Sequence, residues 1–131
     1  MIFIDSNIPM YIVGSDHPNK KRALELVARL IDHGEFLVTD SEVLQEVLHR
    51  YHAINRQDAL DVAVQVLLML VDKVFPVQLE DVLQARELLR TTQGPSARDA
   101  IHVAVMKRYK VHRILTLDRG FDQFPGLERL S

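Results

Sequence analysis

The chain has 131 residues, and 47% of them are hydrophobic, which suffices for one globular domain with its own core. It contains no cysteine, so a disulfide framework and a thiolate metal site are excluded, and a reducing cytoplasm is the expected compartment. The net charge of −2 at pH 7 argues against a surface coated in positive charge for nonspecific binding of nucleic acid. The longest apolar stretch, residues 62–71, contains Gln65 and falls short of the roughly 20 residues that span a bilayer, so we expect a soluble protein.

The first part of the chain predicts strands separated by a helix. Residues 1–4 are apolar and predict a strand, which ends at Asp5. We expect residues 6–18 to connect this strand to a helix through a turn around Gly14. Apolar residues at helical spacing then predict a helix over 19–33, and residues 36–38 form the next predicted strand.

Further along, helix-capping patterns mark where helices begin. Thr39 and Glu42 form a capping-box pattern that begins a helix reaching about residue 51, and Ser96 caps a helix that is apolar on nearly every side. The other predicted elements are a helix over 56–70, a strand over 74–77, a helix over 80–91, the capped helix over 97–108 and a strand over 114–117. This alternation is typical of an α/β protein with a mostly parallel sheet, and no linker divides it, so residues 1–131 form one predicted domain.

Four acids, Asp5, Glu46, Asp99 and Asp118, each follow a short apolar run or lie in the first turns of a predicted helix. In an open α/β sheet, residues just past the carboxyl ends of strands gather in one crevice, so Asp5 and Asp118 can become neighbours. Clustered carboxylates raise one another's pKa unless a cation neutralises them, and hard cations such as Mg²⁺ or Mn²⁺ prefer oxygen ligands. The pattern therefore indicates a site for a divalent cation.

Each acid also has a purely structural explanation. Asp5 and Asp118 suit turn or N-cap positions, and Asp99 suits a capping box at the start of its helix. Glu46 is harder to explain in this way, because it lies near the edge of the apolar face of its predicted helix. Glu42 points away from that face and keeps the capping role.

Basic residues are concentrated in two groups, for which solvated helix faces are the simple explanation and phosphate contacts by part of the second group are the alternative. The groups are Lys20, Lys21 and Arg22, and then Arg98, Lys107, Arg108, Lys110, Arg113 and Arg119. Among the histidines, His49 and His52 lack a third soft ligand that would complete a metal site. His102 lies one turn after Asp99 and can hydrogen-bond near the site, although an ordinary satisfied helix histidine is favoured.

Four segments around these acids resemble the signature segments of PIN-domain proteins, and above all of the VapC-type toxin ribonucleases of prokaryotic toxin–antitoxin pairs. The segments are residues 4–7, 41–47, 97–104 and 115–122. The resemblance covers essentially the whole chain, including its length and the order of its elements. It implies a three-layer α/β/α PIN-like domain with a mostly parallel central sheet.

The resemblance also implies the residues of a site. The matching acidic quartet, which in the family holds one or two Mg²⁺ or Mn²⁺ ions, is Asp5, Glu46, Asp99 and Asp118. Asp122 stands where some family members have a further acid that binds the metal. Thr116 matches a hydroxyl residue that orients carboxylates or water. Asn7 matches a polar residue beside the first acid, and an ordinary turn role for Asn7 stands as the alternative.

The implied reaction is hydrolysis of RNA phosphodiester bonds by in-line attack of water whose pKa the metal lowers, leaving a 5′-phosphate and a 3′-hydroxyl. Single-stranded or loop RNA is the expected substrate, because an unstacked backbone can enter such a crevice, and Arg98 or Arg119 is a candidate for phosphate contact. A small antitoxin protein and a second copy of the chain are the implied partners. The helix over 56–70 is apolar around much of its circumference, so it is a candidate partner surface, with core packing as the alternative.

Other functions remain open from the sequence. A haloacid dehalogenase-like phosphatase would need a second Asp where this chain has Asn7, and the acidic pair, phosphorylatable Asp and late Lys of a phosphoreceiver domain are not found. A noncatalytic RNA-binding or scaffold module would gain nothing from four repelling acids. A housekeeping RNA-processing nuclease would share the chemistry and would lack an antitoxin gene beside its own.

Overall fold

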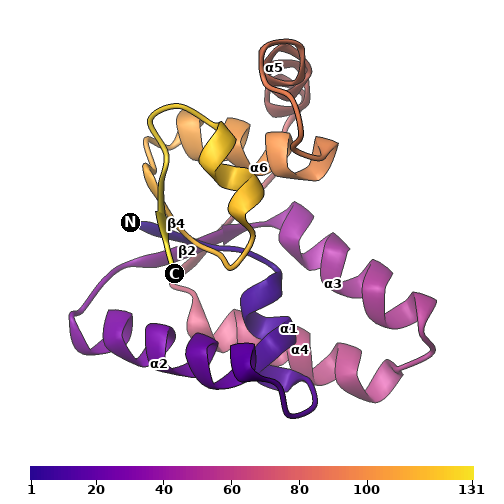
Figure 1. The fold of residues 1–131 in the computed structure, drawn as a ribbon. Helices are drawn as coiled ribbons and strands as arrows, with labels where there is room; N and C mark the ends of the chain where they lie inside the picture. The colour runs from indigo at the N-terminus through magenta and orange to yellow at the C-terminus, as the bar shows by residue number, and fades with distance from the viewer.

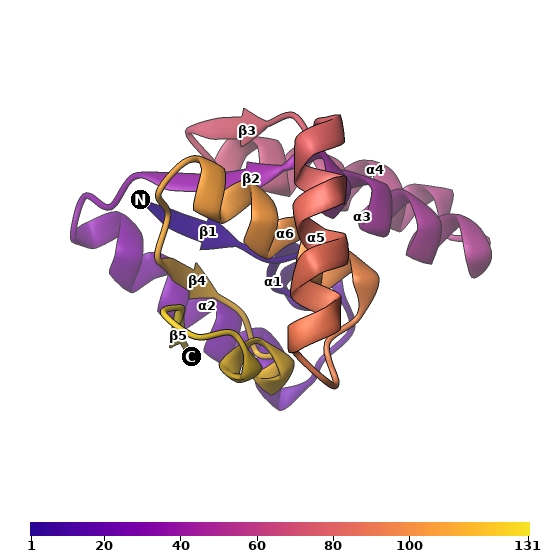
Figure 2. The same ribbon diagram turned by 90° about the horizontal axis from the view of Figure 1, so that it is seen from above.

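A sheet of five parallel strands runs through the centre of the molecule (Figure 1). The strand order is β3-β2-β1-β4-β5, which the labels of Figure 2 show. This computed structural model describes all residues from 1 to 131. The strands are β1 (Ile2–Ile4), β2 (Leu37–Asp40), β3 (Lys73–Phe75), β4 (Arg113–Leu115) and β5 (Glu128–Leu130). The helices are α1 (Asn7–Val13), α2 (Pro18–Asp32), α3 (Ser41–Ala53), α4 (Gln57–Leu70), α5 (Leu79–Thr91), α6 (Ala97–Arg108) and the short 3₁₀ helix η1 (Arg119–Gln123).

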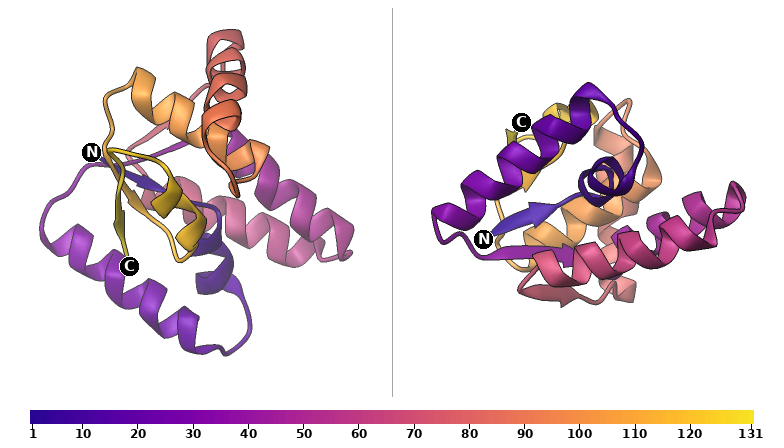
Figure 3. Two further views of the ribbon diagram at one scale, coloured as in Figure 1. Left: turned by 45° about the horizontal axis from the view of Figure 1, so that its top comes forward. Right: turned by 90° about the horizontal axis from the view of Figure 1, so that it is seen from below.

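Helices cover both faces of the sheet, so the molecule has three layers. In Figure 1, α2 and α4 lie below the sheet together with α1, and α5 and α6 lie above it. Figure 2 shows α3 and α4 extending side by side beyond the sheet, and Figure 3 shows the same pair from below. This arrangement confirms the three-layer α/β/α class with a parallel sheet that the sequence predicts.

The strand β1 is the centre of the core and of the topology. Its three residues Ile2, Phe3 and Ile4 are completely buried, as expected for a parallel strand that is covered on both faces. On one side β1 pairs with β2, and on the other side it pairs with β4, with Ile4 opposite Leu115. The strand order therefore reverses at β1, and the carboxyl ends of β1 and β4 open the crevice in which α/β proteins place their sites.

The segment predicted as a loop over residues 6–18 contains a helix instead, because α1 spans Asn7–Val13. Pro9 does not prevent this helix, since the first turn of a helix has no internal acceptors for its N–H groups. Ile8 is fully buried and anchors α1 in the core. A helix as short as α1 is stabilised mainly by packing against the rest of the protein, and local sequence patterns do not predict such packing.

The predicted capping box of Thr39 and Glu42 is wrong by one residue. The strand β2 continues through Thr39, whose hydroxyl donates to the Ile4 carbonyl oxygen at 2.9 Å. Asp40 is the true N-cap of α3, and its carboxylate accepts from the Val43 N–H at 2.9 Å. Glu42 lies in the first turn of α3 without closing the cap.

The C-terminal region adds an edge strand that the sequence did not predict. Residues Glu128–Leu130 form β5 along β4, and β4 itself ends at Leu115 rather than at residue 117. The β5 residues are only partly buried, so their sequence lacks the apolar run that identifies the inner strands.

The helix predicted over 97–108 is confirmed with the same bounds. Ser96 and Asp99 form a reciprocal capping box, in which the Asp99 N–H donates to Ser96 Oγ at 3.1 Å. Six residues of α6 are buried against the sheet, as the apolar sequence predicts. None of the helices combines the length and the apolarity required to cross a membrane.

Candidate metal centre and active site

Asp5 lies at the carboxyl end of β1 and is the most firmly held acid of the crevice. Its side chain is buried and accepts three kinds of donor: the Ser6 N–H at 2.8 Å, the Thr116 hydroxyl at 2.7 Å and the Asn7 amide at 3.2 Å. The Asn7 amide also donates to Thr116 Oγ1 at 2.9 Å, and its oxygen accepts from the Leu117 N–H at 3.3 Å. The two residues predicted to orient the first acid, Asn7 and Thr116, therefore contact it directly.

Glu46 reaches the same crevice from the second turn of α3. Its Oε2 accepts from the Ser6 hydroxyl at 2.6 Å, and its Oε1 lies 2.6 Å from His102 Nε2. The other ring nitrogen of His102, Nδ1, lies 2.8 Å from Asp40 Oδ2. The imidazole is completely buried and joins one carboxylate of α3 to the residue that caps the same helix.

These contacts gather three groups with metal-binding atoms. Ligand atoms of Asp5, Glu46 and His102 all lie within 4.8 Å of one another. Two of the three are carboxylates, which are the ligands that hard divalent cations prefer. The donor set therefore fits a divalent metal ion, with Asp5 and Glu46 as its oxygen ligands.

Asp99 and Asp118, the other two predicted metal ligands, are not part of this group of three. Asp99 closes the cap of α6 by accepting from the Ser96 N–H at 3.4 Å, and it remains partly exposed. Asp118 is exposed and caps η1 by accepting from the Gly120 N–H at 2.8 Å. Both capping roles foreseen as structural explanations are present. Neither role consumes both oxygens of its carboxylate, so each side chain keeps an oxygen for a ligand.

Asp122 has a different environment from the other acids. It lies on η1 and forms a two-point ion pair with Arg129, with Nε to Oδ1 at 2.8 Å and Nη2 to Oδ2 at 3.2 Å. This pair lowers the pKa of Asp122 and raises that of Arg129, in each case chiefly through the hydrogen bonds between them. Asp122 is not brought into the group formed by Asp5, Glu46 and His102.

The electrostatics of the crevice depend on burial and on His102. Burial raises the pKa of Asp5 from 3.8 to about 6, although the charge of His102 and the Thr116 hydrogen bond oppose the rise. Burial disfavours the charged imidazole of His102, but the hydrogen bonds that it donates to Asp40 and Glu46 outweigh this effect and raise the pKa of His102 well above 6.5. The pKa of Glu46 is lowered, because its bond to His102 and the charge of that ring overcome the effect of burial.

Repulsion between acids is visible in the outer part of the site. Burial raises the pKa of Asp99, and the neighbouring charge of Asp118 raises it further. The pKa of Glu42 is also raised, first by burial and then by the charges of Glu46 and Asp40, with His102 opposing them. A divalent cation would relieve this repulsion, since it neutralises the charged forms of several carboxylates at once.

Three residues of the crevice were missed or set aside in the sequence. Ser6, Asp40 and His102 supply the hydrogen bonds that hold Glu46 and the start of α3. Asp40 carried a usable signal, because it ends an apolar run in the same way as Asp5 does. His102 is a satisfied helix histidine, as favoured above, but its two partners come from residues 62 and 56 positions away. No local pattern indicates such contacts.

Some of the basic residues form ion pairs within the protein, and others do not. Arg108 is paired with Asp81 at 2.8 Å, and Arg113 is paired with Glu35 at 3.0 Å. The charge of Arg98 lowers the pKa of Glu46 after the larger effects of burial, His102 and Ser6, which places Arg98 near the crevice. His49 and His52 are exposed on α3, and no group of metal ligands includes them.

Comparison with known proteins agrees with this architecture. The PIN domain model matches residues 2–127. The chain is 49% identical to Ribonuclease VapC13 of Mycobacterium tuberculosis over 131 residues, which is 100% of both chains. Among solved structures it is similar to VapC20 of Mycobacterium tuberculosis, a sarcin-ricin loop cleaving toxin, with a TM-score of 0.77, 22% identity and 93% of each chain covered.

A toxin–antitoxin complex from Klebsiella pneumoniae shares the fold at a TM-score of 0.66 and 15% identity, over 100% of this chain and 97% of that chain. The family model spans nearly all of the chain, and the match to VapC13 runs from end to end. The parallel sheet with helices on both of its faces agrees with the fold of the two solved structures. The chain therefore belongs to the PIN-domain family.

Proposed function

We propose that this protein is a metal-dependent endoribonuclease that hydrolyses RNA phosphodiester bonds and acts as the toxin of a toxin–antitoxin pair. The observation that carries the proposal is the group of Asp5, Glu46 and His102 in a PIN domain, whose potential ligand atoms lie within 4.8 Å of one another. The 49% identity to a full-length ribonuclease supports the activity. We propose further that residues 1–131 form a single PIN-like domain.

The proposed metal ligands are carboxylates. Asp5 and Glu46 hold the ion, Asp99 and Asp118 complete its surroundings on the open side, and Mg²⁺ or Mn²⁺ is the expected ion because both prefer oxygen. When bound, such an ion stabilises negative charge on the phosphodiester and lowers the pKa of a water molecule. Asp122 would join the ligands only by giving up its bonds to Arg129.

The remaining residues of the crevice hold the acids in place. Thr116 and Asn7 donate to Asp5 and fix the plane of its carboxylate. Ser6 and His102 hold the two oxygens of Glu46, so that this long side chain keeps a single orientation. Residues that orient ligands in this way contribute to metal affinity and activity without touching the ion.

Single-stranded or loop RNA is the proposed substrate. The crevice opens at the carboxyl ends of β1 and β4, where an unstacked backbone can approach the acids. The similar VapC20 is a toxin that cleaves the sarcin-ricin loop, which supports a loop as the substrate class. The expected products carry a 5′-phosphate and a 3′-hydroxyl.

The deciding experiment is cleavage of a labelled single-stranded RNA by the purified protein in Mg²⁺, Mn²⁺ or EDTA. We expect cleavage with either metal, none in EDTA and none with Asp5→Asn. The matched control is Asp61→Asn, because Asp61 is an exposed acid on α4 that is bonded only to Gln57. A folded wild type that neither cuts several RNAs nor binds metal in calorimetry would overturn the proposal and favour a noncatalytic module.

We propose an antitoxin as the partner of the face formed by α2 and α4. The inner side of α4 packs in the core through Ala63 and Leu67. Core packing, the alternative explanation for this apolar helix, therefore accounts for one of its faces only. Its outer side leaves Met69 79% exposed, beside Leu70 and the exposed Ile31 of α2 in one shallow pocket. The similar fold within a toxin–antitoxin complex supports such a partner.

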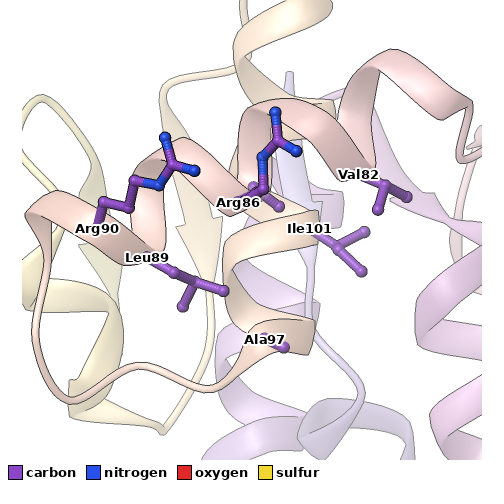
Figure 4. Close-up of a pocket in the computed structure, with 7 residues that line it drawn as sticks. Val82, Arg86, Leu89, Arg90, Ala97 and Ile101 are labelled. Atoms are coloured by element: carbon purple, nitrogen blue, oxygen red, sulfur yellow. The ribbon is translucent and has the colours of Figure 1, made fainter.

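A second copy of the chain is the proposed partner of the groove between α5 and α6. Figure 4 shows Leu89 and Ile101 facing this groove, with Arg86 and Arg90 at its rim, and its volume is about 310 Å³. Light scattering and antitoxin binding test both surfaces together. Leu89→Glu should abolish the dimer and spare antitoxin binding, whereas Met69→Glu should do the reverse. The assignment would be contradicted if neither variant changed the dimer or antitoxin binding, or if both variants had the same effect.

A further inference from the structure

A polar pocket lies beside the proposed active site and has no role in the function described so far. Its volume is about 280 Å³, and it lies between the first turns of α2, the start of η1 and the end of β5. In Figure 1 the C-terminal end of the chain lies above α2. The residues that line the pocket are Asn19, Arg22, Leu117, Arg119, Arg129 and Ser131.

The pocket carries an excess of positive charge. Three arginines line it, and the one carboxylate that pairs with any of them is Asp122, bonded to Arg129. Arg22 and Arg119 are exposed, and neither takes part in any ion pair of the structure. Two exposed arginines that line one polar pocket without an ion-pair partner are suited to bind an anion.

Asp122 gives Arg129 a fixed place in this pocket. Arg129 is 16% exposed, and its Nε and Nη2 are both bonded to the Asp122 carboxylate. The guanidinium has five N–H donors, so three remain for a ligand. The acid that the resemblance places among the metal ligands therefore holds an arginine at the wall of the neighbouring pocket.

Two residues of the pocket connect it to the proposed site through Asp118. Leu117 and Arg119 flank Asp118 in the chain, and the charge of Asp118 acts on Arg129. The Leu117 N–H donates to Asn7, which in turn donates to Asp5. An anion held in the pocket would therefore lie near Asp118, one of the proposed metal ligands.

We propose that this pocket binds a phosphodiester group of the RNA strand, adjacent to the bond that is cut. The proposal rests on the proposed nuclease function and specifies how the strand is aligned. An RNA strand carries a phosphate at every nucleotide. One strand can therefore contact the arginines of the pocket and the proposed metal ligands at the same time. Arginine forks match the two free oxygens of a phosphodiester, and the Asn19 amide adds a donor.

The test is the affinity of a labelled single-stranded RNA, measured by fluorescence anisotropy in EDTA over a series of salt concentrations. Arg22→Gln and Arg119→Gln should each weaken binding about fivefold, as expected for one exposed ion pair. Each should also reduce the slope of log affinity against log salt by about 0.7, the value for one phosphate contact on a single strand. In Mg²⁺, both should raise KM for RNA more than they lower kcat.

Lys21→Gln is the matched control, because Lys21 neighbours Arg22 on α2, is 85% exposed and pairs with Glu25 instead. It should leave affinity and salt slope nearly unchanged, and an equal loss with this variant would overturn the pocket in favour of a general charge effect. Wild-type affinity and slope in both arginine variants, with RNA still cut, would overturn the pocket and leave the nuclease intact. A wild type that neither binds nor cuts RNA would overturn both. Arginine variants that lose binding of an acidic peptide but not of RNA would assign the pocket to a protein partner and overturn the RNA subsite.

Discussion

Asp5 is a buried acid whose surroundings only partly compensate its charge. The Ser6 N–H, the Thr116 hydroxyl and the Asn7 amide donate to it, and His102 adds a positive charge nearby. Burial still prevails and raises the pKa of Asp5 to about 6. A residue in this situation reduces the stability of the metal-free protein at neutral pH and gains the missing compensation from a cation.

The pH dependence of stability should reveal this cost. The folded-state pKa of Asp5, about 6, lies above its ordinary value of 3.8, so its stabilising contribution is present below 3.8 and is lost as the pH rises through 6. The loss is on the order of 3 kcal/mol in the free energy of unfolding. Urea denaturation in EDTA measures this loss. The free energy of unfolding of the Asp5→Asn variant should fall less over the same pH range. Parallel profiles for the two proteins would contradict the assignment.

Thr116 is a positioning residue that the structure isolates well. Its hydroxyl donates to Asp5 and accepts from Asn7 and from the Asp118 N–H at 3.1 Å. Thr116→Val keeps the shape and removes these bonds, so RNA cleavage should fall about 10- to 100-fold while the fold persists. Thr116→Ser should keep most of the activity, because it retains the hydroxyl. Equal activity of the Val and Ser variants in a single-turnover cleavage assay would show that the bonds have no role.

At the scale of elements, Arg108 joins the end of α6 to α5 and β3. It donates to both oxygens of Asp81 at 2.8 Å and to the Pro76 carbonyl oxygen at 2.9 Å. Its guanidinium also lies over the ring of Tyr109, which stacks on Phe75 at 3.7 Å. Asp81 in turn closes the capping box at the start of α5. This cluster holds α6, and therefore Asp99 and His102, at a fixed height above the sheet.

Removal of Asp81 should therefore be costly. Asp81→Ala breaks a buried ion pair and a helix cap, so we expect the free energy of unfolding to fall by about 3 kcal/mol. Glu80→Ala is the matched control, because Glu80 also approaches Arg108, at 3.7 Å, but is 64% exposed. Its loss should stay below about 1 kcal/mol. Similar urea midpoints for the two variants would contradict the structural role of the pair.

For the whole molecule, metal binding and folding should be coupled. Asp5 and Glu46, the two proposed ligands that the structure places in one group, lie 41 positions apart in the chain, so only the folded protein holds them together. Mg²⁺ at about 100 times its dissociation constant should add about 2.7 kcal/mol to the free energy of unfolding. The gain should disappear in Asp5→Asn and persist in Asp61→Asn. Thermal unfolding with and without Mg²⁺ measures it, and an equal gain in both variants would indicate binding elsewhere.

The sequence by itself determined the features that depend on neighbours along the chain. The bounds of α6 and its capping box follow from Ser96, Asp99 and the apolar residues after them, and the structure confirms them. The alternation of strands and helices predicted the mostly parallel sheet, because hydrophobic periodicity is a local property, and the resemblance to PIN domains implied the three layers. The four acids were predicted as metal ligands from local patterns too, since each follows an apolar run or lies in the first turns of a helix, and their role stays a prediction.

The tertiary structure decided everything that depends on which segments meet. The bridge from Asp40 through His102 to Glu46 spans 62 and 56 positions, and Thr116 reaches Asp5 across 111. The helix α1 and the edge strand β5 likewise exist through packing and pairing with distant segments. Burial and long-range hydrogen bonds arise only when the sheet is assembled, and for this physical reason local sequence patterns did not predict the hydrogen bonds that Ser6, Asp40 and His102 make.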